Sequence, residues 1–199
     1  MIAECGPKCI AVGECGLDYD RFQFSDKESQ LRAFPPHFDL AQATGLPMYL
    51  HSRNTNGEFG EIVRNNRSKF TTGVVHSFTG DLSELNDLLS MDLYIGVNGC
   101  SLKTSENIEI VRSIPVERMM IETDCPYCEI RKSSPAYPHI KTHFTYKAKE
   151  KYSADCLVRG RNEPCTIVQV LQAVAAIKGI EESRLAEITY NNACQVFKV

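Results

Sequence analysis

Short apolar runs alternate along this chain with stretches whose apolar residues recur at helical spacing. Runs of this length between helical stretches are typical of buried parallel strands in an α/β protein. A polar residue follows each of four runs: residues 10–13 precede Glu14, 48–50 precede His51, 73–75 precede His76, and 119–121 lie just before Asp124. In such folds the groups that carry out chemistry gather at the carboxyl ends of the strands. The pattern therefore predicts that two imidazoles and two carboxylates meet at one edge of a parallel sheet.

The helix predicted between the first two strands carries both a start signal and a break. A capping-box pattern that begins at Ser25 opens a helix whose stop signal is Gly45. Pro35 and Pro36 lie inside this helix, and an interior proline costs ~3 kcal/mol or more. We therefore expect the helix to break or kink near Phe34.

The remaining elements follow from the same periodicities. Helices are expected around residues 59–63, after Asp81, over 106–113, over 167–177 up to Gly179, and over 185–196, with further strands at 93–97 and 157–159. This makes six strand–helix units and predicts a single domain over residues 1–199, which suits the chain's length. Residues 125–164 show little periodicity, and a connection of that length usually has a functional role.

The long connection is also basic and contains aromatic residues. Residues 131–161 hold eight Lys and Arg against Glu150 and Asp155, a net charge of +6 that leaves −9 on the rest of a chain whose total is −3. The aromatic residues among them are Tyr137, Phe144, Tyr146 and Tyr152. Such a segment can follow a phosphate backbone and stack on bases. The alternative interpretation is a solvated loop.

Composition places the chain among intracellular globular proteins. Apolar residues make up 43% and charged residues 24%, which is ordinary for such proteins, and no apolar stretch approaches the ~20 residues that span a bilayer. The first residues lack a basic and apolar leader, and the nine cysteines are an odd number, which favours reduced thiols. We expect an intracellular protein of the nucleus or cytoplasm with no membrane partner.

The four polar residues at the strand ends suit a metal ion. A single histidine after an apolar run is more often a hydrogen-bonded structural residue than a ligand. Two histidines and two carboxylates at successive strand ends are harder to explain structurally, and this mixed ligand set suits Zn²⁺, Mn²⁺ or Mg²⁺. The residues thus predict a metal-dependent hydrolase.

Six ordered stretches carry a resemblance to a known family. They are GECGLDY (13–19), LHSR (50–53), VHSFTG (75–80), NGCSLKT (98–104), IETD (121–124) and RNEPC (161–165). Together they resemble the successive motifs of the TatD family of metal-dependent deoxyribonucleases, in a eukaryotic branch of it. The likeness implies a TIM barrel of the metallo-dependent hydrolase type that cleaves DNA phosphodiester bonds, often as a 3′ exonuclease.

The resemblance also implies roles for individual residues. The metal ligands would be Glu14, His51, His76 and Asp124, with Asp124 and Glu14 as the catalytic residues. Asp124 would take the proton of a metal-activated water. The residues expected to bind substrate are Arg53, Lys103, Asn98, Tyr127 and Arg161. Arginine offers a fork that matches phosphate, but the alternative interpretation of Arg53 and Lys103 is ordinary surface charge.

The chain departs from the family pattern in three respects, one of which is the proline break near Phe34 in a helix that the family keeps continuous. An eight-stranded barrel takes ~250 residues, and the motifs here begin at what would be the third strand, so we expect an incomplete barrel without its first two strand–helix units. Its open edges would favour self-association, aggregation or a low, broad melting transition. Cys125-Pro126-Tyr127-Cys128 stands where the family has Ala-Pro-Trp-Cys, which is expected to weaken substrate contacts.

Three other functions remain open on the sequence. One is a catalytically impaired relative that only binds metal or nucleic acid. The second is a dithiol redox protein that uses Cys125 and Cys128, although a bare C-x-x-C pattern is a weak signal. The third is an amidohydrolase-like barrel acting on C–N or C–O bonds, for which the first-strand histidine pair of that superfamily is lacking.

Overall fold

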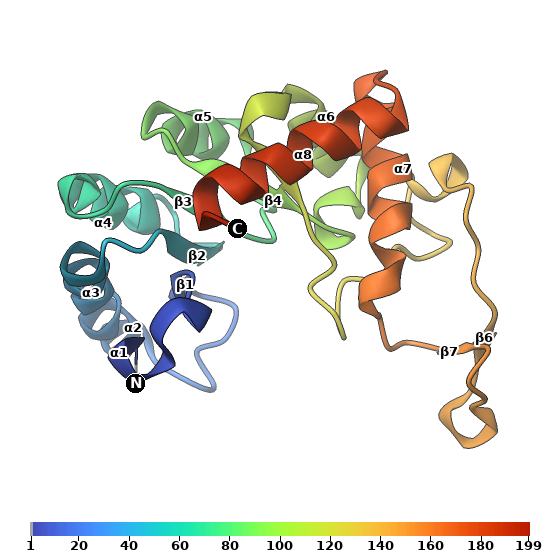
Figure 1. Ribbon diagram of the computed structural model, residues 1–199, viewed down its shortest axis with the longest axis horizontal. Helices are drawn as coiled ribbons and strands as arrows, with labels where there is room; N and C mark the ends of the chain where they lie inside the picture. The colour runs from blue at the N-terminus through green and yellow to red at the C-terminus, as the bar shows by residue number, and fades with distance from the viewer. Residues whose placement is uncertain (1) are drawn as a thin grey trace. The chain divides into compact units, whose positions relative to one another are not determined.

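A computed structural model describes residues 2–199 (Figure 1). Its main sheet has five parallel strands that neighbour one another in chain order. They are β1 (Val12–Asp18), β2 (Met48–Arg53), β3 (Gly73–Val75), β4 (Tyr94–Val97) and β5 (Met119–Ile121). The α/β architecture expected from the sequence is confirmed, and the parallel sheet is consistent with the expected incomplete barrel.

Helices connect these strands and follow them. The α-helices are α1 (Ile2–Cys5), α2 (Lys27–Ala33), α3 (Pro36–Thr44), α4 (Glu58–Asn65), α5 (Leu82–Ser90), α6 (Ser105–Ser113), α7 (Ile167–Lys178) and α8 (Glu182–Phe197). Short 3₁₀ turns are η1 (Gly6–Lys8), η2 (Arg67–Lys69), η3 (Cys100–Leu102), η4 (Val116–Arg118), η5 (Tyr137–His139), η6 (Lys149–Lys151) and η7 (Pro164–Thr166). Within residues 2–199, none of the helices has the length and apolar content that crossing a membrane requires.

The break at the two prolines is confirmed, while the helix start lies one residue later than predicted. Helix α2 ends before Phe34, and α3 begins at Pro36. The N-cap of α2 is Asp26, whose side chain accepts a hydrogen bond from the Ser29 backbone N–H at 2.8 Å. The break lets the Phe34 ring turn into the core, where it is 1% exposed and stacks on Phe59 at 5.6 Å between ring centroids.

The strand expected near Val158 does not belong to the main sheet. Leu157 and Val158 form β7, which pairs in parallel with β6 (Tyr146–Lys147) as a separate two-stranded ribbon. The expectation of six strand–helix units in one sheet was therefore wrong by one unit. A strand of two residues has too little apolar surface to specify a place in a buried sheet, and β6 lies nearby within the same long connection.

The chain divides into two compact units. The first comprises the described residues up to His76, residues 80–95 and residues 191–199, and the second comprises residues 77–79 and 96–190. The core of the first unit includes Phe38, Phe59 and Leu50, and that of the second includes Leu102 and Ile114, all with 0% exposure. A single functional domain over 1–199 stays a prediction.

In the first unit, two glycines allow β1 to run unusually close to β2. Gly13 and Gly16 have φ of 151° and 155°, and a Cβ atom added at either would overlap the backbone of β2. At Gly16 the overlapping atom would be the carbonyl oxygen of His51, its partner in the strand register. The close approach of the two strands therefore depends on the absence of side chains at these positions.

Candidate metal centre

Three of the four predicted ligands lie in the first unit and come from neighbouring strands. Glu14 is in β1, His51 is in β2, and His76 directly follows β3. The His76 backbone N–H donates to the Leu50 carbonyl at 2.9 Å, so the ladder continues one residue beyond β3. Glu14 and His51 therefore lie within their strands, whereas the sequence placed them after the strand ends.

An irregularity in β1 accounts for the position of Glu14. The register with β2 shifts between Val12 and Cys15, and such bulges re-aim side chains and occur often beside active sites. Cys15 itself is 7% exposed, and burial raises the pKa of its thiol to about 12. A thiol with that pKa is protonated at neutral pH, so Cys15 adds no thiolate to the site.

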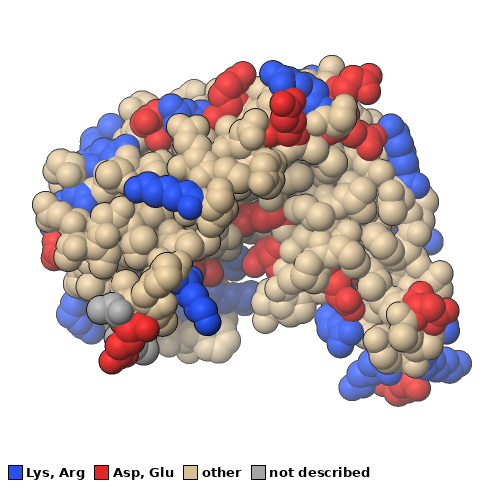
Figure 2. All heavy atoms as spheres, in the orientation of Figure 1, with Lys and Arg blue, Asp and Glu red and all other residues tan. Residues whose placement is uncertain are grey.

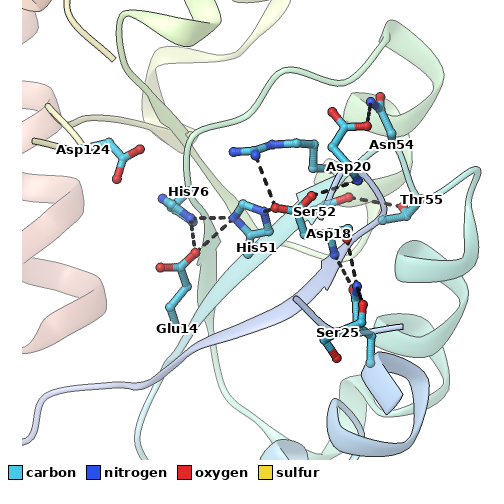
Figure 3. Close-up of polar contacts among 12 residues, drawn as sticks. Glu14, Asp18, Asp20, Ser25, His51, Ser52, Asn54, Thr55, His76 and Asp124 are labelled. Carbon is cyan, nitrogen blue, oxygen red and sulfur yellow. Dashed lines mark hydrogen bonds and ion pairs between the residues drawn. The ribbon is translucent and has the colours of Figure 1, made fainter. Parts of the chain in front are cut away.

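The side chains of Glu14, His51 and His76 converge on one point (Figure 3). Glu14 Oε1 lies 2.8 Å from His76 Nε2 and 3.0 Å from His51 Nδ1, and the two ring nitrogens are 2.9 Å apart. The three side chains differ in exposure: 50% for Glu14, 15% for His51 and 5% for His76. One face of the group is thus held by the protein, while the carboxylate borders solvent.

Electrostatics keep this carboxylate charged. Hydrogen bonds from His51 and then from His76 hold the pKa of Glu14 well below its ordinary value, although partial burial opposes them. An ionised carboxylate and two imidazole nitrogens directed at one point are the oxygen and nitrogen donors that Zn²⁺ and related divalent ions bind. The donor set of the structure therefore fits the metal ion expected from the sequence.

Asp18 supports His51 from the other side of the ring, and sequence reasoning missed this residue. Its Oδ2 atom lies 3.3 Å from His51 Nε2 and 3.2 Å from the Arg53 guanidinium. A carboxylate beside the outer ring nitrogen can accept its N–H, so the inner nitrogen can offer a lone pair to an ion once it no longer donates to Glu14. No local sequence pattern marks Asp18, because its contact with His51 depends on the register between β1 and β2.

The fourth predicted ligand, Asp124, lies in the second unit. It follows β5 and has a φ of 50°. Its Oδ2 atom accepts a hydrogen bond from the Cys128 thiol at 3.3 Å, and its carbonyl accepts one from the Tyr127 N–H at 2.9 Å. Its role as a ligand and base stays a prediction from the sequence.

Asn162 fixes the loop that contains Asp124 and was also missed as an individual residue. It is 4% exposed; its side-chain N–H donates to the Thr123 carbonyl at 3.0 Å, and its backbone N–H donates to the Pro126 carbonyl at 2.9 Å. The Thr166 hydroxyl donates to its Oδ1 atom at 2.6 Å. The RNEPC stretch thus holds the backbone on either side of Asp124.

The residues predicted to bind substrate have different surroundings, and their role stays a prediction. Arg53 pairs with Asp18, and Lys103 is exposed after η3.

Asn98 is fully buried, where its amide donates to Ser77 Oγ at 2.9 Å and accepts from the Cys100 N–H at 2.9 Å. Both ends of the Asn98 amide are therefore used inside the second unit. Tyr127 is 71% exposed, and Arg161 pairs with Glu163 at 3.0 Å.

The geometry gives the redox alternative no support. The Cys128 sulfur lies 2.6 Å from that of Cys100, and the contacts of the described residues include none between the sulfurs of Cys128 and Cys125, the two members of the C-x-x-C pattern. The Cys100 thiol, burial and Asp124 hold the pKa of Cys128 above its ordinary value. Reactive dithiols have a lowered thiol pKa instead.

Comparisons with known proteins match this chain to one family. The protein-family model described as "TatD related DNase" matches residues 2–198 of the sequence. "Deoxyribonuclease Tat-D" of Schizosaccharomyces pombe is 42% identical over 189 residues, which are 94% of this chain and 61% of the relative. "3'-5' ssDNA/RNA exonuclease TatD" of Erwinia tasmaniensis is 33% identical over 97% of this chain and 68% of the relative.

Among solved structures, "Crystal structure of hydrolase TatD family protein from Entamoeba histolytica" superposes with a TM-score of 0.93 and 35% identity. The match covers 98% of this chain and 65% of that one. The chain thus spans about three fifths of the length of the fission yeast relative and two thirds of the amoebal one.

Proposed function

The chain belongs to the TatD-related DNase family, and from this premise we propose that it is a divalent-metal-dependent hydrolase of DNA phosphodiester bonds. The observation that carries the proposal is the convergence of Glu14 Oε1, His51 Nδ1 and His76 Nε2, which all lie within 3.0 Å of one another. The three side chains would hold the ion. When bound, the ion polarises a phosphoryl oxygen and lowers the pKa of a water molecule.

The protein's own residues would position and deprotonate the reacting groups. Asp18 would accept the Nε2–H of His51 and so leave the lone pair of Nδ1 to the ion. Asp124 would accept the proton from the attacking water, a role that rests on its place in the motif order. Arg53 and Lys103 would hold the non-bridging phosphate oxygens. The name of the Erwinia relative supports removal of nucleotides from a 3′ end.

The proposal predicts hydrolysis that a chelator abolishes. A single-stranded oligonucleotide labelled at its 5′ end should shorten stepwise when Mg²⁺ or Mn²⁺ is present, because cleavage proceeds from the 3′ end. Gel electrophoresis of time points with and without excess EDTA measures this. Full activity in EDTA would contradict a metal-dependent mechanism, and binding of metal without any turnover would favour the impaired relative instead.

Glu14→Gln is expected to weaken metal binding by at least ~10–100-fold. That range is the loss that follows removal of a residue that only supports a ligand, and Glu14 is itself the charged member of the group. Titration calorimetry with Mn²⁺ on chelator-treated protein measures the affinity. Glu61→Gln, a change of the same kind at an exposed position of α4, should leave the affinity unchanged. Equal Mn²⁺ affinities for the two variants would show that Glu14 is not a metal ligand.

A further inference from the structure

The β6–β7 ribbon and the turn between its strands carry a surface hollow that the metal chemistry does not use. Its lining residues are Lys149, Tyr152, Val158 and Arg161, called the ribbon site below, and its volume is about 390 Å³. That volume lies at the small end of the ~300–1,000 Å³ of ligand sites. We propose that the ribbon site binds one unstacked nucleotide of single-stranded DNA, an inference that rests on the proposed function and deepens it.

The fold displays an aromatic ring at this site on ordered backbone. Tyr152 follows η6 and is 58% exposed. The turn before it is closed by the Lys151 N–H donating to the Ala148 carbonyl at 2.8 Å, and the turn after it by the Cys156 N–H donating to the Ser153 carbonyl at 3.0 Å. A ring held in this way offers a flat apolar face to solvent without losing further backbone entropy on binding.

The lysines of residues 131–161 differ in how strongly they are already engaged in ion pairs and hydrogen bonds. Lys141 pairs with Glu182 at 2.5 Å, and Lys147 donates to Ser153 Oγ at 2.6 Å. Lys149 and Lys151 are exposed, and within residues 2–199 no acidic side chain pairs with either. Figure 2 shows Lys and Arg side chains on the ribbon, with Asp and Glu side chains among them. These two lysines are therefore available to a phosphate.

Arg161 adds a guanidinium group to the lining of the hollow. Its ion pair with Glu163 is exposed, with 53% of the Arg161 side chain accessible, and exposed pairs contribute little to stability. A phosphate can therefore compete for the guanidinium, which it contacts through two parallel hydrogen bonds. Val158, at 9% exposure, supplies an apolar wall beside the ring.

This combination favours a single strand over other polyanions. Stacking of a base on Tyr152 requires a base face that is not already covered, which a duplex does not offer. An exposed aromatic ring together with cations is the combination that single-strand-binding proteins use. A polyanion without bases would use the lysines and Arg161 but leave Tyr152 without a role.

The test measures binding of the full chain to a fluorescein-labelled 15-mer of deoxythymidine by fluorescence anisotropy in excess EDTA. Tyr152→Leu should weaken binding about 5–150-fold, the loss expected for one stacked base, while Tyr152→Phe should retain it. A 15-mer of abasic sugar-phosphate should bind wild type and Tyr152→Leu equally. The matched control is Tyr190→Leu in α8, where the tyrosine is 69% exposed, and it should behave as wild type.

A second arm tests the cations. Replacing Lys149 and Lys151 together by glutamine should flatten the salt dependence of binding by up to ~0.7 in log–log slope for each phosphate that the protein no longer neutralises. Arg184→Gln on α8, which removes another exposed cation, should leave the slope unchanged.

The outcomes separate the ribbon site from the proposed function. Metal-dependent turnover of bis(p-nitrophenyl) phosphate, which is too small to need the ribbon site, should be the same in Tyr152→Leu and wild type. Tyr152-dependent binding without any hydrolysis would retain the site and overturn the proposed function.

Equal binding of the oligonucleotide by Tyr152→Leu and wild type overturns the ribbon site, as does a loss of binding in Tyr190→Leu equal to that in Tyr152→Leu. Loss on changing only the lysines would show a general polyanion surface and likewise overturn the site.

Discussion

Asp124→Asn is expected to lower the rate of DNA hydrolysis by about 10²–10⁴-fold, the contribution of a positioned general base. The substitution removes the negative charge and the proton-accepting oxygen but keeps the side-chain shape. It is also mild for the backbone, because Asp124 has a φ of 50° and asparagine tolerates that region at least as well as aspartate. The amide oxygen can still accept the hydrogen bond from the Cys128 thiol. Single-turnover rates at saturating Mn²⁺ measure the effect.

A control for this prediction is available elsewhere in the chain. Asp92, which follows α5, has a φ of 61°, so Asp92→Asn imposes the same chemical change on a similar backbone conformation. It should leave the rate unchanged, and both variants should melt within a degree or two of wild type. A normal rate in Asp124→Asn would show that another residue accepts the proton.

Gly16→Ala is expected to be the most destabilising single-methyl change in the first unit. The added Cβ atom would overlap the His51 carbonyl oxygen, and the residue would keep a φ of 155°. Strained backbone and overpacking each cost about 1–3 kcal/mol, so a total of about 2–6 kcal/mol is expected. For a chain of this size each kcal/mol lowers Tm by about 2–4 °C. Calorimetric or circular-dichroism melting in chelator measures the loss.

The matched control separates steric overlap from backbone strain. Gly45, the C-cap of α3, has a φ of 67° and open space where a Cβ would be, so Gly45→Ala should cost only about 1–2 kcal/mol. Gly16→Ala should also weaken metal binding, because β2 must shift and His51 lies on it, whereas Gly45→Ala should not. Equal melting temperatures for Gly16→Ala and Gly45→Ala would show that β1 and β2 can move apart without a loss of stability.

The elements with clear local signals could be predicted from the sequence. Asp81 caps α5 by accepting from the Glu84 N–H, and Gly179 ends α7 in the left-handed conformation, both as expected. The start of α2 was misplaced because Ser25 and Asp26 are both residue types that favour the N-cap position. The backbone conformation at these two residues decides which of them caps the helix, and the sequence does not report it. The residue types at a helix end therefore predict that a helix is present more reliably than they predict its first residue.

The extent of β1 could not be predicted because its burial pattern is hidden by glycine. Cys15 and Leu17 alternate as buried positions after Glu14, but Gly13 and Gly16 interrupt the pattern, and glycine is rare in strands. Ile10, which belonged to the predicted run, is 41% exposed. The apolar run thus indicated a strand and misplaced it by two residues at its start.

The candidate metal ligands were easier to predict than the residues that contact and orient them. Glu14, His51 and His76 each follow directly from a short apolar run, and their donor atoms lie close together, while the role of all four predicted ligands stays a prediction. Asp18 acts through a contact to His51 that is 33 residues away in sequence, and no local pattern reports such a pairing. Strand register, which brings Asp18 opposite Arg53, is a property of the folded sheet.

The exposed ring of Tyr152 also makes the ribbon accessible to optical spectroscopy. The chain contains no tryptophan, so Tyr152→Trp would place its only indole on the ribbon and keep an aromatic face there. Emission excited selectively at the indole would then come from this one surface, free of overlap from other tryptophans. Quenching of that emission on mixing with an oligonucleotide would give the association rate directly, without a label on either molecule.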